Sequence, residues 1–174
     1  MIARAEERFK LQVSADADMD GLGEYGTIGE LMRSGLLAQL GPHEIREGVL
    51  VHNGYLFKVF LPEDPGEAEE RFAAYAWPEV PGSMTPNTAY FADQTGVVSV
   101  TWMSATTYDG LAGGPSADAA YTGEAFWSDV SQGKANPGSD GNVWRPLERE
   151  RAAPEETPGE ESVEMKPSPE PASR

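Results

Sequence analysis

Apolar side chains at the start of the chain recur at intervals of three and four residues, which is the spacing of one helix face. The residues concerned are Ile2, Ala5, Phe9 and Val13. Charged residues fill the remaining surface, and Glu6 and Lys10 are spaced to pair on it. The pattern predicts a short amphipathic helix over residues 1–14.

A second helical pattern begins at Thr27, after a polar stretch over residues 15–26. Thr27 and Glu30 have the spacing of a capping box, in which each side chain accepts a hydrogen bond from the backbone amide of the other. Leucines continue the pattern until Gly41-Pro42 interrupts it. We therefore expect a helix over residues 27–41.

Alternating apolar and polar positions dominate the middle of the chain and predict strands. The clearest signal is Asn53-Gly54, which suits a tight type I′ turn between two strands. The expected strands cover residues 49–52, 55–61, 72–78, 89–92 and 97–103, with a turn at 62–66. The predicted fold class is α+β, with the N-terminal helix packed on a four- to five-stranded antiparallel sheet. We expect the helix stripe to rest on the face that carries Tyr55, Phe57 and Val59.

Composition changes after residue 103. Gly, Ser, Ala and Asp dominate residues 104–147, which we expect to be a long loop region with a short helix near residues 119–130. Residues 148–174 hold eight Glu and five Pro, and their only large apolar residues are Val163 and Met165. This composition predicts a disordered acidic tail behind one domain over residues 1–147.

Charge and residue usage exclude several function classes. The formal net charge is −16, which disfavours nucleic acid as a partner. The chain has no cysteine, so disulfides, thiolate metal sites and cysteine nucleophiles are excluded. His43 and His52 lack metal-ligand spacing, and no nucleophile–base set is visible, so we expect no catalytic residue and no enzyme. No apolar run is long enough for a membrane helix, so we expect no membrane contact by this chain as written.

The polar stretch between the two predicted helices contains carboxylates at alternate positions, followed by Gly21. In the register of an EF-hand loop, the candidate Ca²⁺ ligands are Asp16, Asp18, Asp20 and Glu24. The twelfth position, where a bidentate Glu is needed, is Thr27. The alternative is a loop of Asx turns, in which the aspartates accept backbone amides instead of holding an ion.

Several segments together resemble a known family. They are Ala5-Glu-Glu-Arg-Phe9, Asp16-x-Asp-x-Asp-Gly21, Gly54-Tyr-Leu-Phe-Lys-Val59, Ala74-Tyr-Ala-Trp-Pro78 and Asp93-Gln-Thr-Gly-Val97, with Asp140-Gly-Asn-Val-Trp-Arg-Pro146 as a closing segment. In this order they resemble the soluble head of type IV pilin-like proteins, particularly the major pseudopilins of type II secretion. The resemblance covers roughly residues 1–103 and the closing segment.

The resemblance implies a structural role. Members of this family polymerise through a long hydrophobic N-terminal helix, so we expect a subunit of an envelope filament or secretion machine. Its partners would be other pilin-like subunits or secretion-machinery proteins. Its location would be the periplasmic or extracellular-facing envelope if an upstream helix exists. The family's calcium lies in later loops, where this chain has Asp109, Asp118, Asp129 and Asp140.

The alternative interpretation is a free acidic module on the same fold. Such a module would bind Ca²⁺ or a protein ligand, the latter through the loop over residues 104–142. Ca²⁺ is the one cofactor that the sequence suggests under either interpretation.

Overall fold

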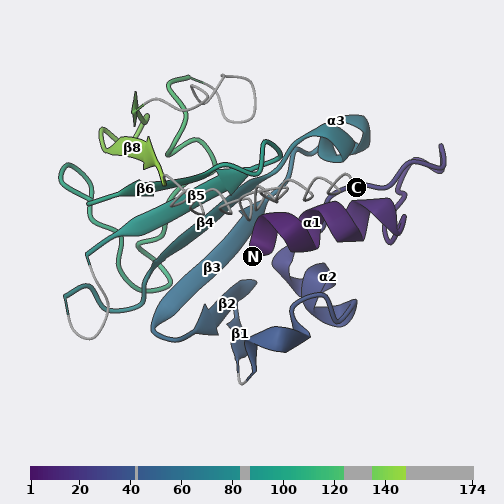
Figure 1. Cartoon of the computed structure of the whole chain (residues 1–174), viewed down its shortest axis with the longest axis horizontal. Helices are drawn as coiled ribbons and strands as arrows, with labels where there is room; N and C mark the ends of the chain where they lie inside the picture. Colours follow the sequence, from purple (N-terminus) through teal and green to yellow (C-terminus); the bar gives the residue numbers. More distant parts are fainter. Residues whose placement is uncertain (42, 83–86, 124–134, 148–174) are drawn as a thin grey trace, which may run out of the picture.

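The molecule is built on an open antiparallel sheet with helices along one face (Figure 1). The computed structural model describes residues 1–41, 43–82, 87–123 and 135–147. The described strands are β1 (Glu44–Arg46), β2 (Val49–His52), β3 (Tyr55–Phe60), β4 (Ala73–Pro78), β5 (Ala89–Asp93), β6 (Val98–Thr101), β7 (Asn136–Pro137) and β8 (Val143–Pro146). They lie in the order β1-β2-β3-β4-β5-β6-β8-β7, and every pair is antiparallel. The described helices are α1 (Ile2–Leu11), α2 (Ile28–Arg33) and α3 (Pro65–Glu70), with a 3₁₀ turn at Ala38–Leu40.

The predicted α+β class and the meander over residues 49–103 are confirmed as β2 to β6. Asn53 and Gly54 have φ values of 51° and 75°, as the predicted type I′ turn requires. The number of strands was underestimated, because eight are present in the described chain. One missed strand is β1, which joins β2 through Glu47-Gly48, a second two-residue turn with positive φ at both positions (51° and 77°).

Both faces of the central sheet are covered. Strand β4 is buried along its whole length, and its side chains alternate between small and large. Tyr75 and Trp77 enter one core, whereas Ala74 enters the other. The helix-side core contains Ile2, Ala5, Phe9, Tyr25, Ile28, Leu31, Leu37, Leu50, Val59, Phe72 and Ala74. The opposite core contains Val49, Leu56, Ala73, Tyr75, Trp77, Ala89, Phe91, Met103, Tyr108, Ala119, Ala120, Tyr121 and Trp144.

Helix α1 lies along the sheet as the amphipathic pattern predicts (Figure 1). Ile2, Ala5 and Phe9 are buried, and they share the helix-side core with Val59 and, at its margin, Phe57. The prediction for Val13 was wrong. The helix ends at Leu11, and Val13 has a φ of 48° and is 46% exposed. The sheet residue Tyr55 also lies outside this core, with its hydroxyl 3.2 Å from that of Thr88.

The predicted helix over residues 27–41 is wrong in length. α2 begins as expected, with Thr27 as its N-cap, but it ends at Arg33. Gly35 has a φ of 76° and donates to the carbonyl of Met32, while Leu36 donates to the carbonyl of Leu31. These two bonds form a Schellman motif, which ends a helix at a glycine of positive φ.

The turn expected at residues 62–66 leads into a helix that the sequence analysis missed. Asp64 caps α3 by accepting a hydrogen bond from the amide of Glu67 at 3.1 Å, and Pro65 occupies the first helical position. An Asp-Pro start with Glu in the first turn is a recognised helix signal. The segment contains few apolar residues, so the hydrophobic pattern did not reveal this helix.

The described part of residues 104–147 is more ordered than a long loop. It contains β7 and β8, and a bridge joins Asp109 to Gly113. Residues 119–123 form turns, not the start of the predicted helix, and residues 124–130 lie outside the described chain. The predicted tail over residues 148–174 also lies outside it. Among the described residues, no helix combines the length and apolar content needed to cross a membrane.

Candidate sites: an acidic loop and an apolar groove beside α1

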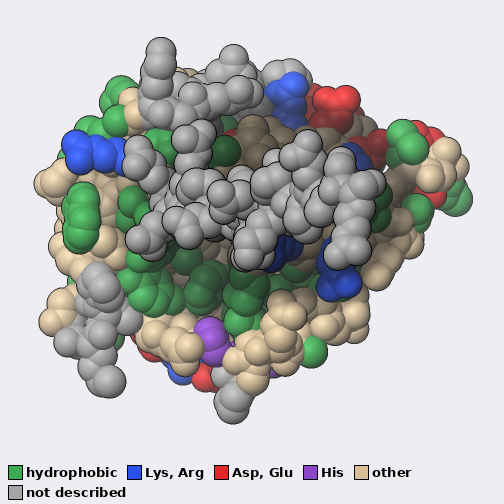
Figure 2. Space-filling view, viewed as in Figure 1, with side chains coloured by type: hydrophobic (Ala, Val, Ile, Leu, Met, Phe, Trp, Pro, Cys, Tyr) green, Lys and Arg blue, Asp and Glu red, His purple; other side chains and the backbone are tan. Residues whose placement is uncertain are grey.

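The acidic loop begins where α1 ends and brings three of the predicted ligands together. One carboxylate oxygen from each of Asp16, Asp18 and Asp20 lies within 4.8 Å of the others, and Asp18 and Asp20 are exposed. Figure 2 shows acidic side chains at the end of the molecule to which α1 leads. Oxygen ligands at this spacing are the kind that Ca²⁺ prefers.

Backbone amides hold these carboxylates in place. Asp16 accepts hydrogen bonds from the amides of Asp20 (3.1 Å) and Gly21 (3.2 Å). Asp18 accepts from the amide of Asp20 at 3.2 Å, and Asp20 accepts from that of Leu22 at 2.7 Å. The loop of Asx turns that the sequence offered as an alternative is therefore present. It leaves one oxygen each on Asp18 and Asp20 that accepts no hydrogen bond from the described residues.

Glu24, the fourth predicted ligand, is placed apart from these three. Its side chain is buried, and Oε1 accepts a hydrogen bond from the amide of Ala17 at 2.8 Å. Glu24 thus joins the two ends of the loop, and it lies outside the group of three carboxylates. What the structure offers an ion is three aspartates on a loop that is already hydrogen-bonded.

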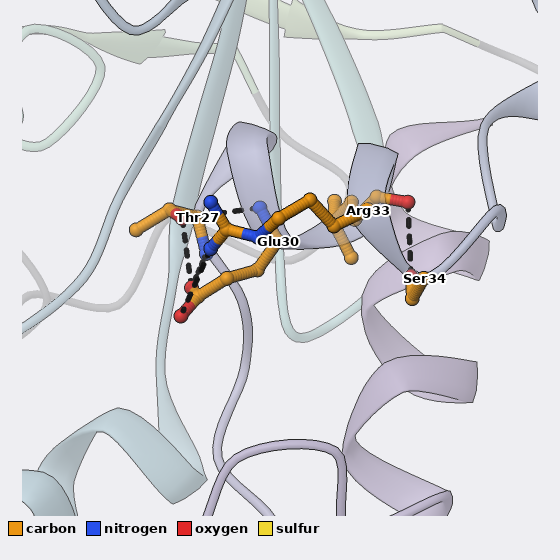
Figure 3. Close-up of polar contacts among 5 residues, drawn as sticks. Thr27, Glu30, Arg33 and Ser34 are labelled. Carbon is orange, nitrogen blue, oxygen red and sulfur yellow. Dashed lines mark hydrogen bonds and ion pairs between the residues drawn. The ribbon is translucent and has the colours of Figure 1, made fainter.

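Thr27 is also occupied, which removes it as the twelfth ligand of an EF-hand register. Figure 3 shows its contacts with Glu30: Oε2 of Glu30 accepts from the Thr27 amide at 2.8 Å and from the Thr27 hydroxyl at 2.7 Å. The Thr27 hydroxyl in turn lies 3.4 Å from the Glu30 amide. The same view shows Ser34 donating to the carbonyl of Leu31 at 2.9 Å and Arg33 beside Glu30 at 3.9 Å.

A buried carboxylate connects α1 to the loop ahead of α2. Glu6 is fully buried, and its Oε2 accepts a hydrogen bond from the amide of Gly26 at 2.9 Å. Its other oxygen, Oε1, has no hydrogen-bond partner among the described residues. Burial raises the pKa of Glu6 to about 8, against the lowering effect of the Gly26 amide, and the nearby Glu30 and Glu7 raise it further.

The prediction that Glu6 lies on the helix surface and pairs with Lys10 was wrong. Residues 2, 5, 6 and 9 follow the full three- and four-residue spacing of a buried face, so the signal was in the periodicity. Lys10 instead donates to the carbonyl of Glu69, and its ammonium lies 5.1 Å from the centre of the Tyr25 ring. It joins α1 to α3.

An apolar groove of about 110 Å³ runs beside the N-terminal end of α1. Its helix wall includes Ile2 and Ala3, and its sheet wall includes Phe57, Ala76, Tyr90, Ala92 and Val98. The small alanines of β4 and β5 keep the floor low, while Phe57 and Tyr90 stand on either side. Figure 2 shows hydrophobic side chains gathered over the sheet beside this end of α1.

Cationic side chains border the groove. A neighbouring hollow shares Val98 with the groove and is also lined by Arg4, Glu7, Arg8 and Gly96. Arg4 and Arg8 are exposed, and among the described residues neither takes part in an ion pair. In a chain of net charge −16, this is a local surface of opposite sign.

In the later loops, where the resemblance places calcium, Asp118 and Asp140 accept hydrogen bonds from neighbouring groups. Asp140 accepts from the hydroxyl of Tyr108, from the amide and side chain of Asn142 at 2.9 and 2.8 Å, and from Trp144 at 3.4 Å. Its proximity also raises the pKa of Tyr108, after the larger effect of burial. Asp118 accepts from the hydroxyl of Ser116 at 2.6 Å.

The other candidates in these loops do not join Asp140. The backbone of Asp109 pairs with that of Gly113 in an isolated β-bridge, and Asp129 lies outside the described residues. In the described part of the chain, the one group of three side chains spaced to hold a metal is Asp16, Asp18 and Asp20. His43 precedes β1 and His52 ends β2, and neither belongs to this group.

Comparison with known proteins gives no match: no family model, no curated protein and no solved structure is significantly similar to this chain.

Proposed function

We propose that this chain is a non-enzymatic structural subunit, a pilin-like head that takes part in an envelope filament or secretion assembly. The observation that carries the proposal is the placement of α1. The helix buries Ile2, Ala5 and Phe9 on the sheet, and the apolar groove lies beside its N-terminal end. A head domain that packs against a few apolar side chains of a neighbouring subunit needs such a surface.

The two covered faces of the sheet add support. Tyr108, Tyr121 and Trp144, which follow β6 in the chain, pack in the core opposite α1, so side chains cover both faces of the sheet. The proposed partners are other pilin-like subunits or secretion-machinery proteins. The proposed location is the cell envelope, facing the periplasm or the exterior.

Assembly can be tested in the source cells with a variant of the groove. Val98 lines the groove and is half-buried, so Val98→Glu places a charge on the proposed contact surface. The matched control is Val80→Glu, because Val80 is 58% exposed and lies outside the groove. We expect the wild type and Val80→Glu in the sheared-filament or envelope-assembly fraction, and Val98→Glu in neither. Equal melting temperatures of the two variants would show that folding is preserved.

Absence of the wild-type chain from both fractions would overturn the proposal. Normal assembly of Val98→Glu would instead show that the groove is not the contact surface between subunits.

A second candidate is a free acidic module that binds Ca²⁺. The observation that favours it is the group formed by Asp16, Asp18 and Asp20, with one oxygen each on Asp18 and Asp20 still available. With three carboxylates and no bidentate Glu, the affinity would be in the range of about 10⁻⁴ to 10⁻³ M. This function needs no groove, so the Val98 variant separates the two candidates.

A further inference from the structure

The groove beside α1 exposes apolar surface that the described chain leaves open. Its floor is built from Ala74, Ala76 and Ala92, and Phe57 and Tyr90 are half-buried at its sides. About 10–15 Å³ of such volume holds one water molecule, so a groove of about 110 Å³ admits side chains of the size of Val and Met. A ligand for this groove must therefore carry a small number of apolar side chains.

The border of the groove adds a charge requirement. Arg4 and Arg8 project from successive turns of α1 on the side of the hollow that meets the groove at Val98. Both are exposed, and neither pairs with a carboxylate of the described residues. A ligand that places acidic side chains next to its apolar ones would gain attraction from both arginines.

The described chain ends beside this groove. The amide of Leu147, the last described residue, donates to the carbonyl of Val98 at 2.7 Å. Val98 lines both the groove and the hollow with the two arginines, as do Met1 and Ala3. The tail therefore begins directly after a residue that is hydrogen-bonded to the groove wall.

The sequence after Leu147 supplies the matching side chains. The segment over residues 155–165 holds five Glu and no Lys or Arg. It ends in Val163-Glu-Met165, so both large apolar residues of the tail lie there, two positions apart. In an extended segment, residues two apart point to the same side, while Glu164 between them points away.

We propose that residues 155–165 of the tail dock in cis on this surface, with Val163 and Met165 in the groove and glutamates beside Arg4 and Arg8. The fifteen residues between Leu147 and Val163 span up to about 50 Å when extended, which leaves ample slack. Tethering of this kind raises the local concentration of the segment to about the millimolar range. The proposal goes beyond the assembly role and does not depend on it, because it concerns the isolated full-length chain, in which no neighbouring subunit occupies the groove.

The test uses the full chain and the absence of natural cysteines. Ser168→Cys is the single thiol in the protein, and a nitroxide spin label attached to it lies three residues after Met165. We expect this label to broaden the methyl resonances of Ala76 and Ala92. The broadening should be lost in Val163→Ser/Met165→Ser and kept in the matched control Ala152→Ser/Ala153→Ser.

Charge reversal tests the arginine border separately. Arg4→Glu/Arg8→Glu should weaken the broadening, and adding Glu160→Arg/Glu161→Arg to the same chain should restore it. Arg4 and Arg8 are exposed on α1 and lie outside the packed core, so rescue by the tail substitutions reports docking and not folding.

Three outcomes would overturn the proposal. One is a wild-type chain whose Ala76 and Ala92 signals are unaffected by the label. Another is broadening that survives Val163→Ser/Met165→Ser. The third is broadening of an unlabelled, isotope-enriched copy by a labelled copy, because the occupant would then be a second molecule. Loss of filament assembly has no bearing on any of the three.

Discussion

The carboxylate of Glu6 accepts a hydrogen bond from the backbone amide of Gly26 at 2.9 Å inside the helix-side core. The contact joins the first helix to the segment that enters the second, across twenty residues of sequence. It brings one ionisable group into an environment that disfavours its charge, because Oε1 has no described partner. The stability of the fold therefore depends on whether Glu6 is protonated.

The raised pKa of Glu6 predicts that the free energy of unfolding falls as pH rises. Burial raises its pKa from 4.5 to about 8, so between these values the folded state holds a proton that the unfolded state has released. The contribution is complete below pH 4.5 and is lost as pH rises to about 8. At about 1.4 kcal/mol per pH unit, the free energy of unfolding would fall by at most about 4 kcal/mol from about pH 5 to about pH 8.

Urea unfolding at a series of pH values measures this effect. Glu6→Gln should flatten the profile, while the exposed control Glu63→Gln should keep the wild-type slope. A residual slope of the same sign is expected in Glu6→Gln, since burial also raises the pKa of Asp93. Parallel profiles for the wild type and Glu6→Gln would contradict the prediction.

Phe9 and Leu11 lie two residues apart on α1 and have opposite environments. Phe9 is 3% exposed and packs in the helix-side core, whereas Leu11 is 79% exposed. Phe9→Ala should therefore lower the free energy of unfolding by about 3–5 kcal/mol, while Leu11→Ala should change it by less than about 0.5 kcal/mol. Chemical denaturation of both variants tests the packing of α1, and equal midpoints would disprove it.

The central sheet could be predicted because its signals are local. Asn53-Gly54 specifies a turn type by itself, and the alternation on both sides of it sets which residues share a face. The weaker signals of the same kind were missed. Glu47-Gly48 forms an equivalent turn, and Gly35 ends α2 in a way that a leucine-rich pattern conceals.

The core opposite α1 depends on contacts between residues far apart in the sequence, which local patterns do not predict. Tyr108, Tyr121 and Trp144 lie in a segment of loop composition, yet they cover Tyr75 and Phe91 on the sheet. Their aromatic character was the available signal. Their partners, separated by dozens of residues, follow only from the three-dimensional path of the chain. The candidate metal group was predictable for the opposite reason, because Asp16, Asp18 and Asp20 are neighbours in one loop.

Gly23 and Gly29 provide a matched pair of glycine substitutions with opposite expected signs. A Cβ at Gly23 would lie 2.1 Å from the carbonyl oxygen of Lys10, so Gly23→Ala must separate the acidic loop from α1. At Gly29, in α2, the nearest atoms to a Cβ are 4.0 Å away. Gly29→Ala should raise the free energy of unfolding by about 0.4–1 kcal/mol, whereas Gly23→Ala should lower it. Thermal unfolding of the two variants gives the signs directly, and a stabilised Gly23→Ala would contradict the close approach.

Calcium should act on the acidic loop if the second candidate function holds. An ion that binds the folded state raises the melting temperature, and saturation at about 100 times the dissociation constant adds about 2.7 kcal/mol. We expect the rise with CaCl₂ to disappear in Asp18→Ala, which removes a carboxylate with an available oxygen. The control is Asp64→Asn, an exposed acid that caps α3 far along the sequence, in which the calcium-dependent rise should persist.

Magnesium serves as the second control, because it demands octahedral geometry and gives up its water reluctantly. A rise in melting temperature that is equal for both ions, or that survives Asp18→Ala, would reflect general screening of a chain of net charge −16. No rise at all would leave the three aspartates with the structural role that their hydrogen bonds to Asp20, Gly21 and Leu22 already give them.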